Sequence, residues 1–175
     1  MSTKNTQPYY TIEEREADIK KEDMLMYDKH IEDLYREKQV CLYPKYCNIC
    51  GGKVEYIENK LIYGKPYGSG YAYRCTSCGA YVGTHEPRPK QALGILANKE
   101  MRNWKMKCHD LFDSYWKGQK NPQKKRKNCY SWLADKLGIS ISQCHFGYFD
   151  LDMLKHAHEI ITLAKTQGIN IGEVK

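Results

Sequence analysis

Apolar residues in the first part of the chain recur at helical spacing among charged side chains. They are Met24, Tyr27, Ile31 and Leu34. Thr11 followed by Glu14 is a capping pattern typical of a helix start. We therefore expect an acidic helix over residues 11–40 whose narrow apolar stripe packs on the rest of the chain or, alternatively, on a second copy in a homodimer. Residues 1–10 are polar, and we expect them to be disordered.

From residue 41 the pattern changes to short β-like runs interrupted by glycine. Residues 53–57, 61–63 and 71–74 predict strands because β-branched and aromatic residues recur in them. The glycine-broken stretch 64–70 predicts a turn between two of these strands. Residues 41–89 are therefore expected to form a small β module.

Beyond Pro89 the apolar spacing becomes helical again. One face runs from Leu93 to Tyr115 at a period of 3.6 residues, and Gly118 marks its end. The opposite face of this predicted helix is basic. It carries Lys99, Arg102 and Lys105.

Capping patterns predict two further helices. Asn121-Pro122 is a helix start and Gly138 a helix end, while Asp150 is a good N-cap for the last helix. Residues 90–166 thus form a predicted helical region of about three helices, followed by a tail over residues 167–175. The expected fold class is α+β, with a small β module packed against these helices and preceded by the N-terminal helix.

Two cysteine pairs in the β module have the spacing of metal-binding turns. Cys47-x-x-Cys50 and Cys75-x-x-Cys78 are each followed by glycine, which permits the positive φ that such a turn needs. Four thiolates suit zinc and leave no open coordination position, so we predict one structural zinc ion in a zinc ribbon. The 24 residues between the pairs are expected to hold a β-hairpin.

The remaining cysteines and the hydropathy pattern bear on the cellular compartment. No stretch approaches the roughly 18 continuous apolar residues of a membrane span, and the polar start is unlike a secretory signal. We therefore expect a cytoplasmic protein with no membrane partner. In a reducing compartment Cys108 and Cys129 are best interpreted as small core residues, and Cys41 as a bystander to the zinc site.

The two cysteine turns and a set of downstream motifs resemble a zinc-finger-containing family, largely uncharacterised, encoded mainly by bacteriophages and prophages. The resemblance covers roughly residues 45–160. The downstream motifs are residues 84–97, Arg102, residues 109–113, Trp116, and residues 130–134, 137–139 and 144–147. This resemblance implies the zinc site and a phage setting in the cytoplasm of a bacterial host, and it implies no reaction.

Positive charge is concentrated in the middle of the chain. The net charge is +7 overall, −3 over residues 1–40, +4 over 41–90, +7 over 91–127 and −1 over 128–175. A basic middle with interleaved tyrosines is typical of a surface that binds nucleic acid, although a solvated surface has the same charges. The candidate nucleic-acid-binding residues are Lys65, Tyr67, Tyr71, Arg74, Lys99, Arg102, Lys105, Lys124, Lys125, Arg126 and Lys127.

Four other polar residues are candidates for a second site, either a metal centre or an acid–base pair. They are His85, His109, Asp113 and His145. The alternative for His109 and Asp113, four residues apart on one helix, is a hydrogen bond on the helix surface.

The sequence favours a non-enzymatic binding module for DNA or RNA. Lysine and arginine would contact phosphates, and tyrosines of the ribbon would stack on bases. The first alternative is a phage-encoded protein that binds and inhibits or redirects a host protein, such as a defence or transcription component. The second alternative is a metal-dependent nuclease.

Overall fold

The structure is a computed structural model that describes residues 41–173. The chain divides into two compact units, which meet in the sequence between Asn98 and Lys99. The helix expected over residues 11–40, and with it the homodimer contact, lies outside the described residues. No helix in the described part is long and apolar enough to cross a membrane.

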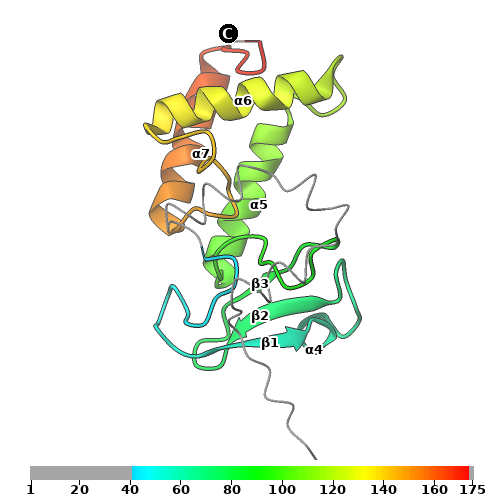
Figure 1. Ribbon diagram of the computed structural model, residues 1–175. Helices are drawn as coiled ribbons and strands as arrows, with labels where there is room; N and C mark the ends of the chain where they lie inside the picture. The colour runs from blue at the N-terminus through cyan, green and yellow to red at the C-terminus, as the bar shows by residue number, and fades with distance from the viewer. Residues whose placement is uncertain (1–40, 174–175) are drawn as a thin grey trace, which may run out of the picture. The chain divides into compact units, whose positions relative to one another are not determined.

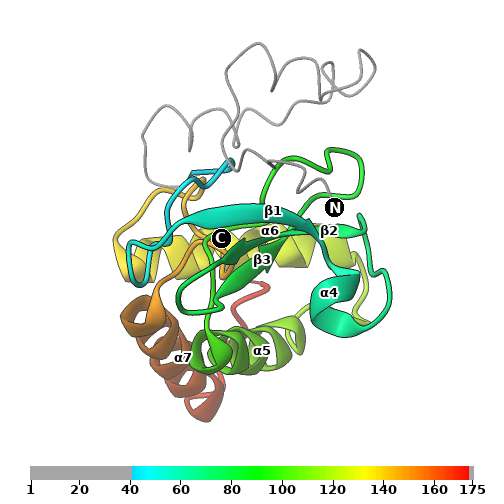
Figure 2. The same ribbon diagram turned by 90° about the horizontal axis from the view of Figure 1, so that it is seen from below.

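The first unit contains a three-stranded antiparallel sheet in the order β1-β2-β3 (Figures 1 and 2). Strands β1 (Val54–Glu58) and β2 (Tyr71–Cys75) form the hairpin predicted between the two cysteine pairs. Strand β3 (Tyr81–Gly83) adds to the other side of β2.

Residues 61–63 are part of a helical turn, and the strand predicted there is wrong. Helix α4 (Lys60–Tyr63) forms because the amides of Tyr63 and Gly64 donate to carbonyls four residues earlier. The side-chain oxygen of the buried Asn59 accepts from the amide of Tyr67, which folds the following loop back onto the turn. This local pairing replaces the ladder that a strand would need.

One face of the sheet packs into the core of this unit. The core residues gather on that face and on the segment that follows β3, and Tyr56 packs against them. They are Cys47, Val54, Tyr73, Cys75, Ala80, Val82, Ala92 and Leu96.

Residues 90–98 belong to the β unit, although the sequence placed them in the helical region. Ala92 pairs with Thr84, and Ala97 pairs with Tyr81. Because the backbone groups of this segment are bonded to the edge of the sheet, its apolar residues do not continue the helix. The first helix therefore begins at Lys99 and not near Leu93.

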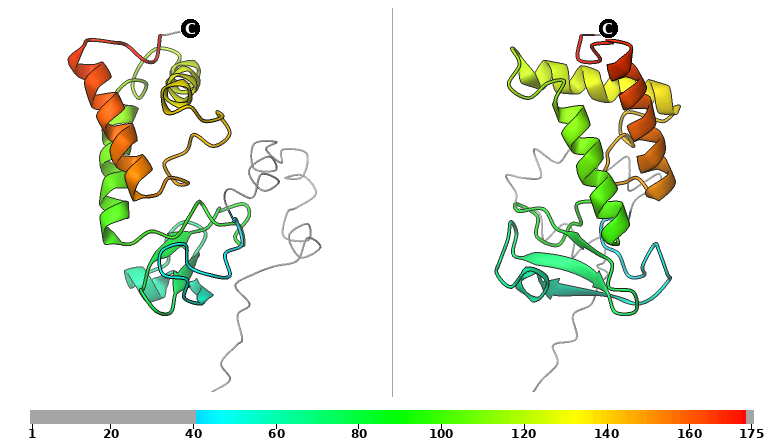
Figure 3. Two further views of the ribbon diagram at one scale, coloured as in Figure 1. Left: turned by 90° about the vertical axis from the view of Figure 1, so that its left-hand side faces the viewer. Right: turned by 180° about the vertical axis from the view of Figure 1, so that it is seen from behind.

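The second unit contains three helices, as predicted for the described part of the chain. Helices α5 (Lys99–Asp113) and α7 (Leu151–Thr166) lie side by side and run in the same direction, and α6 (Pro122–Leu137) crosses them (Figures 1 and 3). The side chain of Asp150 accepts from the amide of Met153 at 2.9 Å, which confirms the predicted N-cap.

Candidate metal centre

The two cysteine pairs lie in turns with the same backbone hydrogen bonds. The amide of Gly51 donates to the carbonyl of Cys47 at 2.9 Å, and the amide of Gly79 donates to the carbonyl of Cys75 at 3.1 Å. The two glycines have φ angles of 71° and 72°, a conformation that costs glycine nothing. The sequence Cys-x-x-Cys-Gly thus builds one kind of turn twice.

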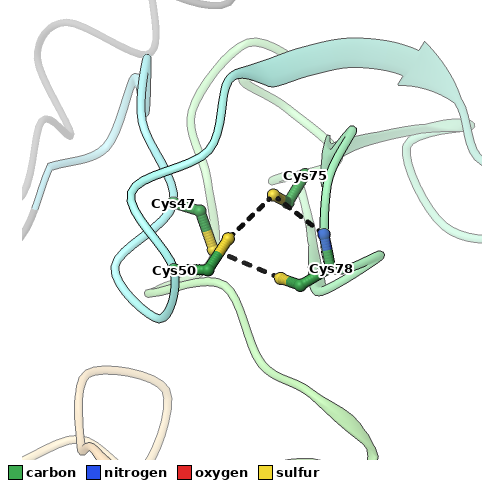
Figure 4. A group of neighbouring side chains, drawn as sticks. All are labelled: Cys47, Cys50, Cys75 and Cys78. Atoms are coloured by element: carbon green, nitrogen blue, oxygen red, sulfur yellow. Dashed lines mark hydrogen bonds between the residues drawn. The ribbon is translucent and has the colours of Figure 1, made fainter.

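These turns bring the four sulfur atoms together (Figure 4). The Sγ atoms of Cys47 and Cys78 lie 3.7 Å apart, those of Cys50 and Cys75 lie 3.5 Å apart, and all four lie within 4.8 Å of one another. Zinc–sulfur bonds of about 2.3 Å in a tetrahedron place sulfurs about 3.8 Å apart. The four thiolates therefore fit one zinc ion.

Backbone amides stabilise the thiolate form of these cysteines. Three of the four sulfurs accept hydrogen bonds of 3.4 to 3.5 Å from backbone N–H groups. Burial raises the pKa of Cys75, but the amides of Cys78 and Ser77 and the thiol of Cys50 lower it more, to about 6. The amides of Gly52 and Ala80 likewise lower the pKa of Cys50 and Cys78, but burial and hydrogen bonds to neighbouring thiols outweigh them and raise both values. Of these three cysteines, Cys75 is therefore the one prepared for the deprotonated form in which cysteine binds a metal.

A closed set of four cysteines gives the zinc ion a structural role, because no coordination position remains for water or a substrate. Within residues 41–173 these four form the only cluster of three or more metal-binding side chains. The fold and the site together define a small zinc-finger protein of the α+β class. The chain belongs to the zinc-finger-containing domain family, whose model matches residues 43–164. No curated protein and no solved structure matches it.

Gly52 is a close-approach position that the sequence alone did not single out. A Cβ atom at this residue would lie 2.5 Å from the Oγ of Ser77 and 3.1 Å from the Sγ of Cys75. We expect Gly52→Ala to push the second turn away and to destabilise the zinc-bound unit by about 1–3 kcal/mol. Competition with a zinc chelator measures this loss.

The double variant Gly52→Ala, Ser77→Gly is the control for this prediction. Removing the side chain of Ser77 eliminates the closest contact, so the alanine should cost less in this background than in the parent. An equal loss in both backgrounds would contradict the steric explanation.

The tyrosines of the ribbon lie in two different surroundings. Tyr71 stacks on Tyr56 at 5.0 Å between ring centroids, on the core side of the sheet. Tyr67, by contrast, is 73% exposed, and its ring meets Tyr63 edge-on at 6.1 Å. Tyr63 also meets Tyr81 at 5.8 Å.

Two of the predicted cations of the ribbon, Lys65 and Arg74, are exposed. In the second unit, Lys99 is exposed, but Lys105 donates to the carbonyl of Gly147 at 3.1 Å. Burial, with a smaller contribution from Arg102, lowers the pKa of Lys105 to about 8. Lys105 is therefore engaged within its own unit.

The basic run at the start of α6 also divides into exposed residues and residues that contact other side chains. Lys124 and Lys127 are exposed. Lys125 pairs with Glu173 at 3.0 Å. The guanidinium of Arg126 lies 5.6 Å from the ring of Trp116 and 4.9 Å from that of Tyr130, so it packs between two aromatic side chains.

The residues considered for a second site do not form a metal cluster within the described part of the chain. The carboxylate of Asp113 accepts from the indole N–H of Trp116 at 3.1 Å and pairs with Lys117 at 2.6 Å. His109 meets the ring of Phe146 edge-on at 5.0 Å.

His145 stacks on Tyr130 at 5.4 Å between ring centroids. His85 lies in the other unit, where burial and then the charge of Arg88 lower its pKa to about 4. A function for these histidines stays a prediction.

The cysteines of the helical unit are core residues, as the sequence predicted for two of them. Burial raises the pKa of Cys108 and Cys129 to about 11 and that of Cys144 to about 12. At neutral pH these thiols keep their protons, so none has the thiolate character of a nucleophile.

Proposed function

We propose that this protein is a non-enzymatic zinc-ribbon protein that binds nucleic acid through the face of the sheet opposite the ribbon core. The observation that carries the proposal is a group of three tyrosines in which the ring of Tyr63 contacts those of Tyr67 and Tyr81. Exposed aromatic rings of this kind stack on unpaired bases, each stacked base contributing about 1–3 kcal/mol.

The register of the sheet supports this assignment of faces. Side chains alternate along a strand, so Arg74 points away from the core side, to which its neighbours Tyr73 and Cys75 contribute. Arg74 pairs directly with Tyr81, and paired residues of antiparallel strands share a face.

Cations beside the tyrosines fit the phosphates of a single strand. Arg74 and Lys65 are both exposed, and neither has a carboxylate partner within residues 41–173. A guanidinium or ammonium next to stacked rings lets one strand place its bases on the rings and its backbone on the charges. Single-stranded nucleic acid therefore suits this face better than a duplex, whose bases are already stacked.

Titration with oligothymidine and with a duplex of equal length, each at several salt concentrations, tests the proposal. We expect Tyr67→Ala to weaken single-strand binding about tenfold, which corresponds to one lost stacking contact, and to change duplex binding less. Tyr46→Ala is a matched control, because Tyr46 is also exposed but lies outside the cluster. Equal losses in the two variants would refute the assignment of the face.

The exposed lysines of α6 supply a separate test of phosphate contact. Lys124→Gln with Lys127→Gln should weaken binding similarly for unrelated sequences and flatten the salt dependence, since phosphate contacts carry no base information. Neither lysine has an ion pair within the described residues, so folding should not change. Unchanged affinity and an unchanged salt slope would remove α6 from the proposed surface.

A second candidate function is the binding of a host protein in a phage setting. The observation in its favour is an exposed apolar side chain on the same helical turn as Tyr63: Leu61 is 65% exposed. Aromatic and aliphatic side chains together are common at protein interfaces. Absence of oligonucleotide binding even at low salt would favour this alternative over nucleic acid.

A further inference from the structure

The loop of residues 85–91 follows β3. A backbone hydrogen bond joins its two ends, and two prolines restrict its middle. The amide of His85 donates to the carbonyl of Gln91 at 2.9 Å, and the amide of Gln91 donates to the carbonyl of Arg88 at 2.9 Å. Pro87 and Pro89 flank Arg88 and restrict its backbone further. The loop thus holds Arg88 in a defined place.

The side chain of Gln91 is an uncommon feature of this loop, because it is polar and 0% exposed. Its Oε1 accepts a hydrogen bond from the Nε of Arg88 at 2.9 Å. Its Nε2 is buried and has no partner within the described residues. Buried polar groups normally have partners, so an unused donor beside a held arginine points to a ligand.

The same loop contains a second buried polar atom without a partner in the described part of the chain, the Nε2 of His85. Burial, followed by the charge of Arg88, lowers the pKa of His85 to about 4, so the ring is neutral at pH 7. Either ring nitrogen of a neutral imidazole can hold the proton, so Nε2 can donate to a ligand without adding charge.

Most of the hydrogen-bond donors of the Arg88 guanidinium are available. No ion pair joins it to a carboxylate within residues 41–173. Because Gln91 occupies only the Nε–H, the two terminal Nη groups remain for another partner. A guanidinium whose orientation is already fixed loses little conformational entropy when it binds an anion through two parallel hydrogen bonds.

We propose that Arg88 is a phosphate-binding residue and that the buried Gln91 positions its guanidinium for this contact. The ligand is a phosphate group, from the backbone of a nucleic acid or from a free phosphate or nucleotide. The hydroxyl of the core residue Tyr73 donates to the carbonyl of Lys90 in this loop, so the loop packs on the core side of the sheet. The opposite face, which carries Tyr63, Tyr67 and Tyr81, is called the tyrosine face, and the site does not require it to bind nucleic acid.

NMR titration of the zinc-loaded full chain tests the inference, with inorganic phosphate in one arm and oligothymidine lacking a terminal phosphate in the other. Chloride keeps the ionic strength constant. We expect the Nε–H resonance of Arg88 and the side-chain amide of Gln91 to shift and saturate. Saturation with phosphate alone identifies a free ligand, and saturation with the oligonucleotide identifies a backbone contact. No saturating shift in either arm overturns the proposal.

Three variants make the test specific. Arg88→Lys keeps the positive charge but cannot form the two parallel hydrogen bonds of a guanidinium, and we expect it to weaken binding about tenfold. Gln91→Glu places a carboxylate on Arg88, which should abolish binding while retaining the link between the two side chains. Lys90→Gln removes the neighbouring charge and should have a small effect. Zinc content and the backbone spectrum verify that each variant is folded.

Two results would separate this inference from the proposed function. If Lys90→Gln weakens binding as much as Arg88→Lys, the contact is general electrostatic attraction and the inference is wrong. If Tyr67→Ala weakens oligonucleotide binding and Arg88→Lys alters binding in neither arm, nucleic-acid binding by the tyrosine face is supported and the phosphate site at Arg88 is refuted.

Discussion

Replacing Cys47 with serine should release the zinc ion and unfold the β unit while the helical unit stays folded. Zinc binding contributes about 10–16 kcal/mol in small zinc-finger peptides, which exceeds the total stability of an ordinary small domain. The Sγ of Cys47 lies 3.7 Å from that of Cys78, so Cys78→Ser should have the same effect. The largest loss of structure is expected over residues 41–98.

Elemental analysis and amide NMR spectra measure this result. The parent should contain one equivalent of zinc, and the variant almost none. The amide signals of α5, α6 and α7 should remain dispersed in the variant, because those helices form their own compact unit. Cys41→Ser is the matched control, since Cys41 is an exposed cysteine outside the zinc cluster. Parent protein that carries no zinc after careful purification would contradict the prediction.

The zinc site could be predicted from sequence because its determinants are local. A Cys-x-x-Cys-Gly turn fixes the direction of its two sulfurs by the backbone bond at the glycine, whatever surrounds it. Two such turns supply four thiolates, which together match the tetrahedral coordination of one zinc ion. The capping residues of the helices are local in the same sense, and Asp150 and Gly138 lie where they were expected.

Two elements were misassigned because the sequence does not show where their backbone hydrogen bonds close. The spacing of Leu93, Leu96 and Ala97 fits a helix, but Ala97 pairs with Tyr81 across the edge of the sheet. A pattern of apolar residues does not tell whether backbone hydrogen bonds close within the segment or with another one. The same reason explains why the helical turn α4 could not be distinguished from a short strand.

The basic residues show a further limit of sequence reasoning. Four consecutive cations at 124–127 are equivalent in the sequence, yet Arg126 packs between two aromatic rings and Lys125 pairs with Glu173. Trp116 and Glu173 lie on other segments, so charge counting could not separate Arg126 and Lys125 from the exposed lysines beside them. Arg88 becomes a candidate only when its neighbour Gln91 is seen to be buried and bonded to it, because the sequence does not show the burial of a polar side chain.

Phe112→Ala should unfold the helical unit and leave zinc bound. Phe112 is 0% exposed and contacts the rings of Tyr130 at 4.8 Å and Phe146 at 5.2 Å, so truncation removes the centre of an aromatic cluster. Such a change costs about 3–5 kcal/mol, a large part of the stability of a unit of this size. The signals of α5–α7 should collapse in the amide spectrum.

Met106→Ala is the matched control for this prediction, because Met106 lies on the same helix and is 62% exposed. Its truncation should change stability by less than about 0.5 kcal/mol. The zinc content of both variants should stay at one equivalent, since the four ligands and the core of the β unit are untouched. If Phe112→Ala releases zinc in the same transition that unfolds the helices, the two units fold as one, and the division at Asn98 has no thermodynamic meaning.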